Sequence, residues 1–339
     1  MGENMRFVVY AAGAVGGVLG GHLALSKHEV LLVCREEHAR AVGEAHGLRM
    51  KSGTGEYLAP LRATAGLSAA DIDSDTCVLF TPKSNDTERC LEALGGVAAR
   101  DVPIVSFQNG VTNEEIIAKR FENVFGGVCR MTCSFLQPGQ VSFRKMGRLA
   151  IGRHPKGAHP FSKKLAAALE EAGFDVTVSN GIMCDKWLKL VVNLQSAFNA
   201  IIDPRDHDGV EFVDLKVGVL EEAKTVLHAE KMKVKSCDER EPGIDDVVNE
   251  LRKPKAPRSP SAVKVNNSTW QNLYLKRKTV ENGFFHGPIM EMAEKHGIAV
   301  PFNEIALELV TESARKELGP GAFRAGEILA RIKERGGHS

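Results

Sequence analysis

Apolar residues occur in short runs along the first half of the chain, separated by small or polar residues. Residues 5 to 10 and residues 29 to 33 are such runs, and the stretch from residue 14 to residue 26 between them has helical character. This order predicts a β-loop-α-β unit, in which a crossover helix joins two parallel strands. The same alternation predicts further strands at residues 76–80, 102–107, 123–127, 148–152 and 174–178 and helices at residues 86–99, 113–120 and 161–172.

After residue 180 the pattern changes to long helical segments. They are expected at residues 182–202, 214–233, 269 to about 295 and 303–318. The fold class that follows is α/β, with a parallel-sheet domain at residues 1–180 and an all-α domain at residues 181–339. The total of 339 residues agrees with about two domains, each able to bury its own core.

The charge balance and the composition argue against several classes of binding partner and against a membrane span. The chain has 44 basic and 43 acidic residues, so its formal net charge is +1. This balance argues against nucleic-acid and anionic-membrane partners, which normally select a basic excess. The stretch from residue 7 to residue 25 is uncharged and long enough to span a bilayer. Its five glycines and His22 argue against both a membrane span and a signal peptide.

The seven cysteines indicate a reduced, cytoplasmic protein. They are odd in number, form no C-x-x-C pair and lie mostly in apolar stretches. Cys129 and Cys133 have no second Cys or His pair at zinc spacing, and the 11 histidines show no H-x-x-x-H pattern. We therefore expect no metal site.

Glycine is over-represented, with 33 of 339 residues against a usual share of about 7%. Gly13 and Gly16 lie between the first strand and the first helix, where the dinucleotide fingerprint G-x-G-x-x-G stands. Small residues there let the backbone approach a pyrophosphate, and the helix N-terminus supplies N–H groups. We expect Gly13, Ala14, Val15 and Gly16 to contact a cofactor, although Ala11 replaces the first glycine. Plain strand–helix packing is the alternative for so short a pattern.

The residues after the second strand distinguish between the two nicotinamide cofactors. An NAD site would place an acidic residue there, whereas this chain has Cys34 and Arg35, and a cation suits the 2′-phosphate of NADPH. Glu36 would blur this preference if its carboxylate pointed at the ribose. Lys83 and Asn109 follow two later strands, so we expect them at the same sheet edge as the glycine loop.

A lysine in the helical half is the candidate general acid. Lys189 and Asn193 are one turn apart in a helix that is otherwise apolar on every side, which predicts a buried polar face. Burying an ammonium is costly, so a role in a cleft is favoured over a lysine that snorkels to the surface. Lys186, beside Asp185, is expected to be the solvated lysine. A buried ammonium would protonate a carbonyl oxygen as a hydride reaches the carbon.

These features resemble those of the ketopantoate reductases, which reduce ketopantoate to pantoate with NADPH in pantothenate biosynthesis. The resemblance implies a Rossmann-type NADP(H)-binding domain, a helical domain like the C-terminal domain of 6-phosphogluconate dehydrogenase, and a small 2-oxo acid substrate. It covers nearly the whole chain and rests on the glycine loop, Arg35, Lys83, residues 108–110, Lys189 with Asn193, and residues 267–272, 279–281 and 296–301.

The resemblance also assigns roles to residues. It implies that Lys189, Glu281 and Asn109 are catalytic and that Asn193 and Ser268 bind the substrate. Its cofactor contacts fall on Gly13, Ala14, Val15, Gly16, Arg35, Lys83, Asn109 and Glu281.

Four positions depart from the family pattern. Ala11 replaces a glycine, Ala197 a second asparagine two turns after the lysine, Asn272 an aspartate and Gly283 an acidic residue. Three alternatives therefore stay open: a reductase of another 2-oxo acid, an opine-type dehydrogenase on the same fold, and a non-catalytic NADP(H)-binding sensor. The sensor would explain the altered pocket but not the retained Lys189. A homodimer is compatible with the sequence, which does not fix the oligomeric state.

Overall fold

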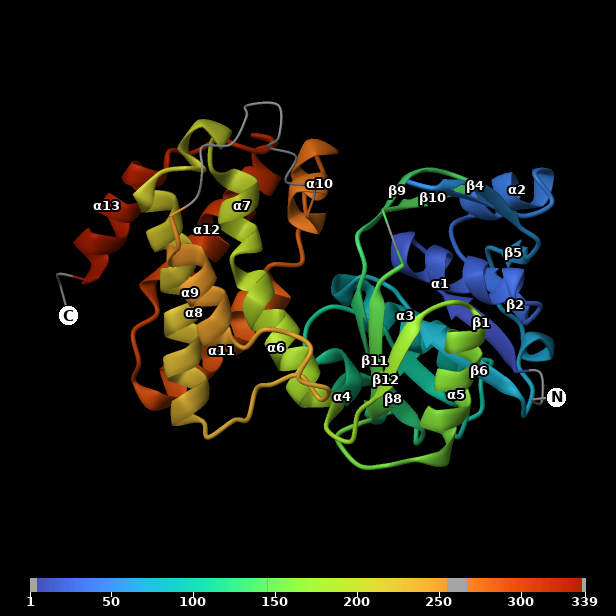
Figure 1. Ribbon diagram of the computed structural model, residues 1–339. Coiled ribbons are helices and arrows are strands. Elements are labelled where there is room, and N and C mark those ends of the chain that lie inside the picture. Colours follow the sequence, from blue (N-terminus) through green and yellow to red (C-terminus); the bar gives the residue numbers. More distant parts are fainter. Residues whose placement is uncertain (1–4, 145, 255–266, 337–339) are drawn as a thin grey trace. The chain divides into compact units, whose positions relative to one another are not determined.

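The computed structural model describes residues 5–144, 146–254 and 267–336 (Figure 1). The chain divides into two compact units, Met1–Lys186 and Trp187–Ser339, which we call unit 1 and unit 2. The division falls inside helix α6 (Ile182–Leu194), whereas the predicted domain boundary precedes this helix at residue 180. Unit 1 is built around β-sheets and unit 2 is helical, so the predicted fold class is confirmed.

Unit 1 is centred on a large sheet. Among the described residues it has eight strands in the order β12-β11-β8-β7-β6-β1-β2-β5. Neighbouring strands from β5 to β8 run parallel, so the carboxyl ends of β2, β1, β6 and β7 meet at one edge, where an open α/β sheet binds its ligand. The strands are β1 (Arg6–Tyr10), β2 (Glu29–Val33), β5 (Arg62–Thr64), β6 (Thr76–Phe80), β7 (Ile104–Ser106), β8 (Val124–Arg130), β11 (Arg148–Arg153) and β12 (Asp175–Val178).

Alternate residues of these strands face two different hydrophobic cores. In β1, Phe7 and Val9 belong to one core with residues of α1 and α5, whereas Val8 and Tyr10 belong to the other with residues of α3 and α4. A strand covered on both faces needs an unbroken apolar run, as the sequence around β1 provides. Helix α5 begins at Pro160. Proline lacks an N–H group, but the first N–H groups of a helix have no partner within the helix, so proline costs no hydrogen bond there. The helices of unit 1 are α1 (Ala14–Leu25), α2 (Glu36–Glu44), α3 (Thr87–Gly95), α4 (Asn113–Ala118) and α5 (Pro160–Glu171).

Two features of unit 1 differ from the sequence prediction. Strand β11 pairs antiparallel with β8, so the large sheet is not parallel throughout. Within the described ranges a second, four-stranded sheet has the order β4-β3-β10-β9, in which Arg49 pairs with Gln140. Such a pairing joins distant parts of the chain, which the periodicity of a short run does not reveal. The strands of the second sheet are β3 (Leu48–Ser52), β4 (Gly55–Ala59), β9 (Cys133–Gln137) and β10 (Gln140–Phe143).

Unit 2 consists of helices grouped around α8 (Val210–Ala229), which contacts α9, α11, α12 and α13. The helix predicted over residues 182–202 is interrupted at Gln195, whose side-chain amide donates to the Val192 carbonyl oxygen at 3.1 Å. This bond satisfies one of the carbonyls that a helix end leaves without a helical partner. The other helices are α7 (Ser196–Ile201), α9 (Ile244–Arg252), α10 (Ser268–Tyr274), α11 (Gly283–His296), α12 (Pro301–Arg315) and α13 (Ala325–Gly336).

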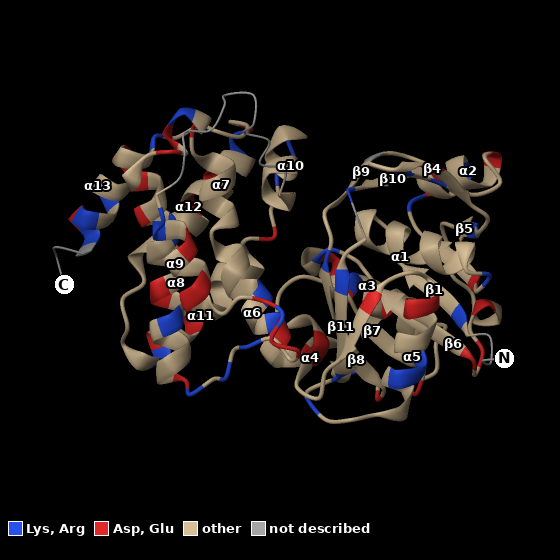
Figure 2. Ribbon diagram, viewed as in Figure 1, with Lys and Arg blue, Asp and Glu red and all other residues tan. Residues whose placement is uncertain are grey.

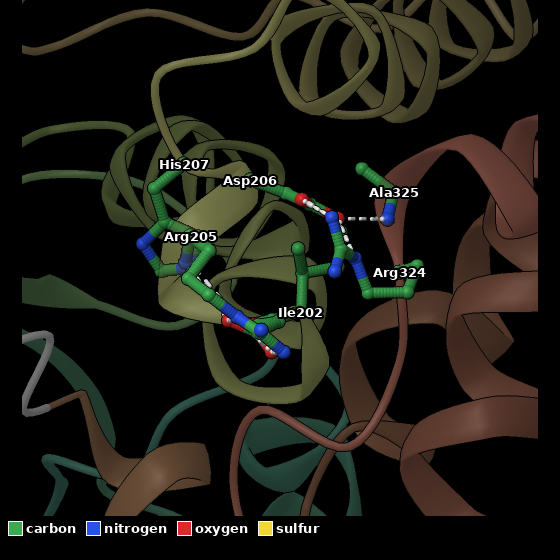
Figure 3. Close-up of polar contacts among 7 residues, drawn as sticks. Ile202, Arg205, Asp206, His207, Arg324 and Ala325 are labelled. Atoms are coloured by element: carbon green, nitrogen blue, oxygen red, sulfur yellow. Dashed lines mark hydrogen bonds and ion pairs between the residues drawn. The ribbon is translucent and has the colours of Figure 1, made fainter.

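The start of α13 is held by the segment that follows α7 (Figure 3). Both carboxylate oxygens of Asp206 accept hydrogen bonds from the Arg324 guanidinium, and Oδ2 also accepts from the N–H of Ala325 at 2.8 Å. These hydrogen bonds, led by those from Arg324, lower the pKa of Asp206. A negative charge is favourable at a helix N-terminus, so Asp206 attaches α13 to the rest of unit 2.

No helix in the described part of the chain combines the length and the apolar character needed to cross a membrane. The uncharged stretch from residue 7 to residue 25 instead contributes to β1 and α1.

Candidate functional site

Several loops meet at the carboxyl edge of the large sheet in unit 1, and hydrogen bonds join them. The N–H of Ala12 donates to the Val33 carbonyl oxygen at 2.9 Å, which links the loops after β1 and β2. The N–H of Thr81 donates to the Tyr10 carbonyl oxygen at 3.0 Å, which links the loops after β6 and β1. Oγ1 of Thr81 donates to the same carbonyl oxygen at 3.1 Å. The structure therefore brings together the loops that carry the predicted cofactor contacts of unit 1.

The two glycines of the first loop have different surroundings. Gly16 is buried, and a Cβ atom placed there would lie 2.4 Å from Oγ1 of Thr81 and 2.9 Å from Cγ1 of Val9. Glycine is therefore needed at position 16 for α1 to approach the sheet. Gly13 is the N-cap residue of α1, and a Cβ atom placed there would meet no protein atom within 4 Å. This space at a helix N-terminus fits a pyrophosphate group.

Ala11 adopts the backbone conformation that glycine would favour in this loop. Its φ is 58°, in the left-handed region, which costs a residue with a Cβ atom roughly 1–2 kcal/mol. Oγ1 of Thr81 lies 3.4 Å from the Ala11 carbonyl oxygen, so the end of β6 supports the loop. Ala14 and Val15, which open α1, are partly exposed. The loop therefore accommodates the alanine through backbone strain.

The end of β2 presents a cation beside a neutral thiol. Arg35 is exposed and is the N-cap residue of α2. Burial raises the pKa of Cys34 to about 11, so its thiol carries no charge at neutral pH. Glu36 lies in the first turn of α2, where a carboxylate interacts favourably with the helix dipole. Lys83 is partly buried after β6 and is the N-cap residue of a short 3₁₀ helix.

Asn109 lies in a loop that buried polar side chains hold in place. Its carbonyl oxygen accepts hydrogen bonds from Oγ of Ser84 at 3.2 Å and from Nδ2 of Asn113 at 2.8 Å. Asn113 is fully buried, and its Oδ1 accepts from Oγ1 of Thr87 at 2.9 Å. Nε2 of Gln108 donates to the same hydroxyl at 2.8 Å. This network fixes the backbone after β7, while Asn109 itself stays partly exposed.

A buried ion pair lies beside the same loop and overturns the prediction for Lys186. Lys186 is 3% exposed and Glu114 is 0% exposed, and Nζ of Lys186 forms an ion pair with Oε1 of Glu114. Nζ also donates to the Gln108 carbonyl oxygen at 3.1 Å. The prediction that Lys186 is solvated is wrong, because a carboxylate 72 positions earlier compensates its charge. Asp185 is also buried, and its Oδ2 accepts from Oγ of Ser179 at 2.9 Å.

The predicted catalytic lysine belongs to unit 2. Lys189 and Asn193 are one turn apart on α6, and both are partly buried. Lys189 is thus less enclosed than the apolar residues around it suggest, since Leu188 and Leu190 are each 1% exposed. Partial exposure is what a lysine that meets a small molecule requires.

Ser268 and Glu281, two further predicted site residues of unit 2, are linked through their neighbours. Ser268 is the exposed first residue of α10, and Oγ1 of the adjacent Thr269 donates to Oδ1 of Asn282 at 3.1 Å. Asn282 follows Glu281 directly, so this bond joins the start of α10 to the turn before α11. Asn267 caps α10 by accepting from a backbone N–H, and its Nδ2 donates to a backbone carbonyl at the start of α7.

The positions that depart from the ketopantoate reductase pattern differ in their surroundings. Ala197 is fully buried in α7, beyond the break at Gln195, so it does not continue the face of α6 that carries Asn193. Asn272 is buried, and its Oδ1 accepts from Arg277 at 3.1 Å. At Gly283 a Cβ atom would meet no protein atom within 4 Å. Packing therefore restricts position 197 but not position 283.

Across the described ranges, no group of three or more His, Cys, Asp and Glu side chains is placed to hold a metal ion.

Both units match models of one protein family. Residues 7–156 match the model described as Ketopantoate reductase PanE/ApbA, and residues 181–314 match the one described as Ketopantoate reductase PanE/ApbA C terminal. The chain belongs to the ketopantoate reductase family. The resemblance predicted from the sequence is thereby confirmed.

Curated members of the ketopantoate reductase family match the chain over nearly its full length. A 2-dehydropantoate 2-reductase from Pyrococcus horikoshii is 28% identical over 324 residues, covering 94% of this chain and 100% of that protein. The enzyme of the same name from Halobacterium salinarum is 29% identical, covering 92% of this chain and 99% of that protein.

Two solved structures share the fold. The crystal structure of a PanE/ApbA family ketopantoate reductase from Ralstonia eutropha is 27% identical, with a TM-score of 0.77, and covers 92% of this chain and 100% of that one. A D-mandelate dehydrogenase solved with NADH and anilino(oxo)acetate has a TM-score of 0.79 at 23% identity, covering 93% of this chain and 100% of that one. At that identity the second likeness establishes the fold alone.

Proposed function

We propose that this protein reduces ketopantoate to pantoate with NADPH, as an oxidoreductase of pantothenate biosynthesis. The observation that carries the proposal is family membership across both units, with Lys189 and Asn193 at the family's spacing on α6. The relatives named 2-dehydropantoate 2-reductase support this reaction over the opine-type dehydrogenase and the non-catalytic sensor.

NADP(H) fits the carboxyl edge of the sheet in unit 1. The open space beside Gly13 at the N-terminus of α1 suits the pyrophosphate. Exposed Arg35, beside the neutral Cys34 thiol, suits the 2′-phosphate. Lys83 would add a second cation, and Asn109 would meet the nicotinamide. When bound, the reduced nicotinamide supplies a hydride.

Residues of unit 2 would bind the oxo acid and supply the proton. Ser268 would hydrogen-bond the substrate carboxylate, and Asn193 and Glu281 would bind its hydroxyl. As the hydride adds to C2, Nζ of Lys189 would donate a proton to the C2 oxygen, so that the carbonyl becomes an alcohol. The ammonium would also stabilise the negative charge that develops on this oxygen.

The test is NADPH oxidation with ketopantoate, measured beside pyruvate, 2-oxoisovalerate, benzoylformate and mixtures of a 2-oxo acid with an amine. We expect the highest kcat/KM for ketopantoate. Lys189→Ala should lower kcat by about 10²–10⁴-fold, because the general acid is lost, while the Kd for NADPH changes less than about threefold. Lys163→Ala, at an exposed position of α5, is the matched control. A higher kcat/KM for another substrate, or an unchanged kcat in Lys189→Ala, would contradict the proposal.

The preference for NADPH over NADH belongs to this proposal and rests on Arg35. A cytoplasmic location and a homodimer stay predictions from the sequence.

A further inference from the structure

One ammonium group joins two parts of unit 1 that lie more than 70 positions apart in the chain. Nζ of Lys186, near the start of α6, contacts Oε1 of Glu114 in the first turn of α4 and the carbonyl oxygen of Gln108 after β7. Figure 2 shows the acidic start of α4 beside the charged start of α6. Both side chains of the pair are buried. The pair therefore fixes the loop that carries Asn109 and the beginning of α6 against each other.

Two glycines on neighbouring strands of the large sheet make room for the side chain of Lys186. Gly126 of β8 and Gly152 of β11 are directly paired across the two strands. A Cβ atom at Gly126 would lie 3.0 Å from Cγ1 of Ile182 and 3.5 Å from Cδ of Lys186. A Cβ atom at Gly152 would lie 2.2 Å from the carbonyl oxygen of Ser179. The two glycines therefore let the chain entering α6, and the stem of Lys186, lie directly on the sheet.

Folding stability alone gives little reason for this pair. Removing two charges from water is costly, and well-packed apolar side chains often replace a buried ion pair without loss of stability. Within the described residues, Oε2 of Glu114 is buried and has no hydrogen-bond partner, which adds to the cost. The pair instead fixes positions, because an ammonium that contacts both the Glu114 carboxylate and the Gln108 carbonyl oxygen restricts where each of them can lie.

We propose that Lys186 and Glu114 are positioning residues for the reductase reaction. They would hold the loop of Asn109 in place through the Gln108 carbonyl group and would hold the beginning of α6, the helix on which Lys189 follows Lys186 by three residues. The proposal rests on the proposed function, because it assigns the reaction to Lys189 and Asn109. A displacement of a reacting group by about 1 Å can lower the rate by about 10²-fold.

The deciding experiment removes the ion pair without leaving a buried charge. In the double variant Lys186→Met/Glu114→Leu, we expect a melting temperature close to that of the wild type. We also expect at least a tenfold lower kcat for ketopantoate and a Kd for NADPH that changes less than about threefold. The single variant Lys186→Met leaves Glu114 buried and unpaired, so it should lose stability as well as activity.

The control for lost stability is Leu169→Ala, in the fully buried part of α5. It should lower the melting temperature while kcat stays within about twofold of the wild-type value. If the double variant folds and keeps the wild-type kcat, the pair is structural only and the proposal is overturned.

Hydrogen exchange makes the test independent of the reaction. In the double variant, the backbone amides of residues 108–112 and 182–188 should exchange at least tenfold faster than in the wild type, while Leu169→Ala should not change them selectively. Unchanged exchange in these segments overturns the proposal whatever the activity. If the wild type does not reduce ketopantoate, the proposed function fails, and the exchange rates alone decide whether Lys186 anchors the loop and the helix.

Discussion

Both units bury a polar cluster, but at different places in the fold. In unit 1, Gln108, Asn113, Glu114 and Lys186 are buried beside a loop at the carboxyl edge of the large sheet. In unit 2, the corresponding cluster joins side chains of α8, α11 and α12. The first cluster therefore acts on a loop that meets a ligand in the proposed function, and the second acts on the packing of helices.

The cluster of unit 2 caps a helix from outside. Helix α12 begins at Pro301, and its own N-cap residue makes no side-chain capping bond. Glu222 of α8 accepts from the N–H groups of Phe302 at 2.9 Å and Asn303 at 3.0 Å, and from Nδ2 of Asn303 at 2.8 Å. Oδ1 of Asn303 accepts from Nδ1 of His286 at 2.9 Å. Buried polar groups thus serve two purposes in one chain: the cluster of unit 1 holds a loop at the edge of its sheet, and the cluster of unit 2 caps a helix.

The largest expected effect that tests this comparison is on the pH dependence of stability, at Glu222. Burial raises the pKa of Glu222 from its usual value near 4.5 to about 7, although the hydrogen bonds from Phe302 and Asn303 lower it. Between these values the folded state holds a proton that the unfolded chain has lost, so the free energy of unfolding falls as pH rises from about 4.5 to about 7. The loss amounts to about 3 kcal/mol.

Glu222→Gln should remove this loss, because the amide does not titrate. In urea unfolding, the difference in the free energy of unfolding between variant and wild type should shift by about 3 kcal/mol in favour of the variant from pH 4.5 to pH 8. The kcat at pH 7 should stay unchanged. Glu291→Gln, at an exposed position of α11, should follow the wild type. A loss of kcat in Glu222→Gln would break the comparison, since it would give the cluster of unit 2 a part in the reaction.

A smaller effect is expected from Arg35→Ala at the sheet edge. The variant should raise the Kd for NADPH about tenfold, because a charge-assisted hydrogen bond to the 2′-phosphate is lost, and should leave the Kd for NADH within about twofold. Arg40→Ala is the matched control, since Arg40 is also exposed and lies in α2, the helix that Arg35 precedes as N-cap residue. Fluorescence titration measures both constants. An equal rise in the Kd for both cofactors would contradict the assignment of Arg35 to the 2′-phosphate.

The smallest effect is expected from Ala11→Gly. Glycine adopts the positive φ of this position without strain, so the variant should raise the free energy of unfolding by about 1 kcal/mol. Ala39→Gly, inside α2, should lower it by about 0.5–1 kcal/mol, because glycine is unfavourable inside a helix. Urea unfolding of the two variants gives opposite signs if the loop is strained as described, and equal signs exclude that strain.

The sequence allowed the parallel sheet and its ligand edge to be predicted, because buried strands and crossover helices follow from local periodicity. Arg35, Lys83 and Asn109 each follow a strand, and parallel strands bring such residues to one edge without knowledge of distant contacts. The second sheet was not predictable in this way, since the pairing of Arg49 with Gln140 depends on the folded chain.

The two lysines of α6 show where prediction from the sequence ends. Helical spacing correctly places Lys189 and Asn193 on one face, but it does not reveal that Lys186 is the more deeply buried lysine. Only Glu114, from another part of the chain, makes that burial tolerable. The break at Gln195 is likewise invisible in the helical period and changes the position of Ala197.

Gly16 and Thr81 share one small volume, which couples the two positions in evolution and in protein engineering. A Cβ atom on residue 16 would lie 2.4 Å from the hydroxyl oxygen of Thr81. A larger residue at position 16 therefore requires a smaller residue at position 81 as well as a shift of Val9, whose Cγ1 would lie 2.9 Å away. The change at position 81 also removes the support of the Ala11 loop. Such substitutions are non-additive, so their order matters. Libraries that aim to retune this loop for another dinucleotide must vary both positions at once.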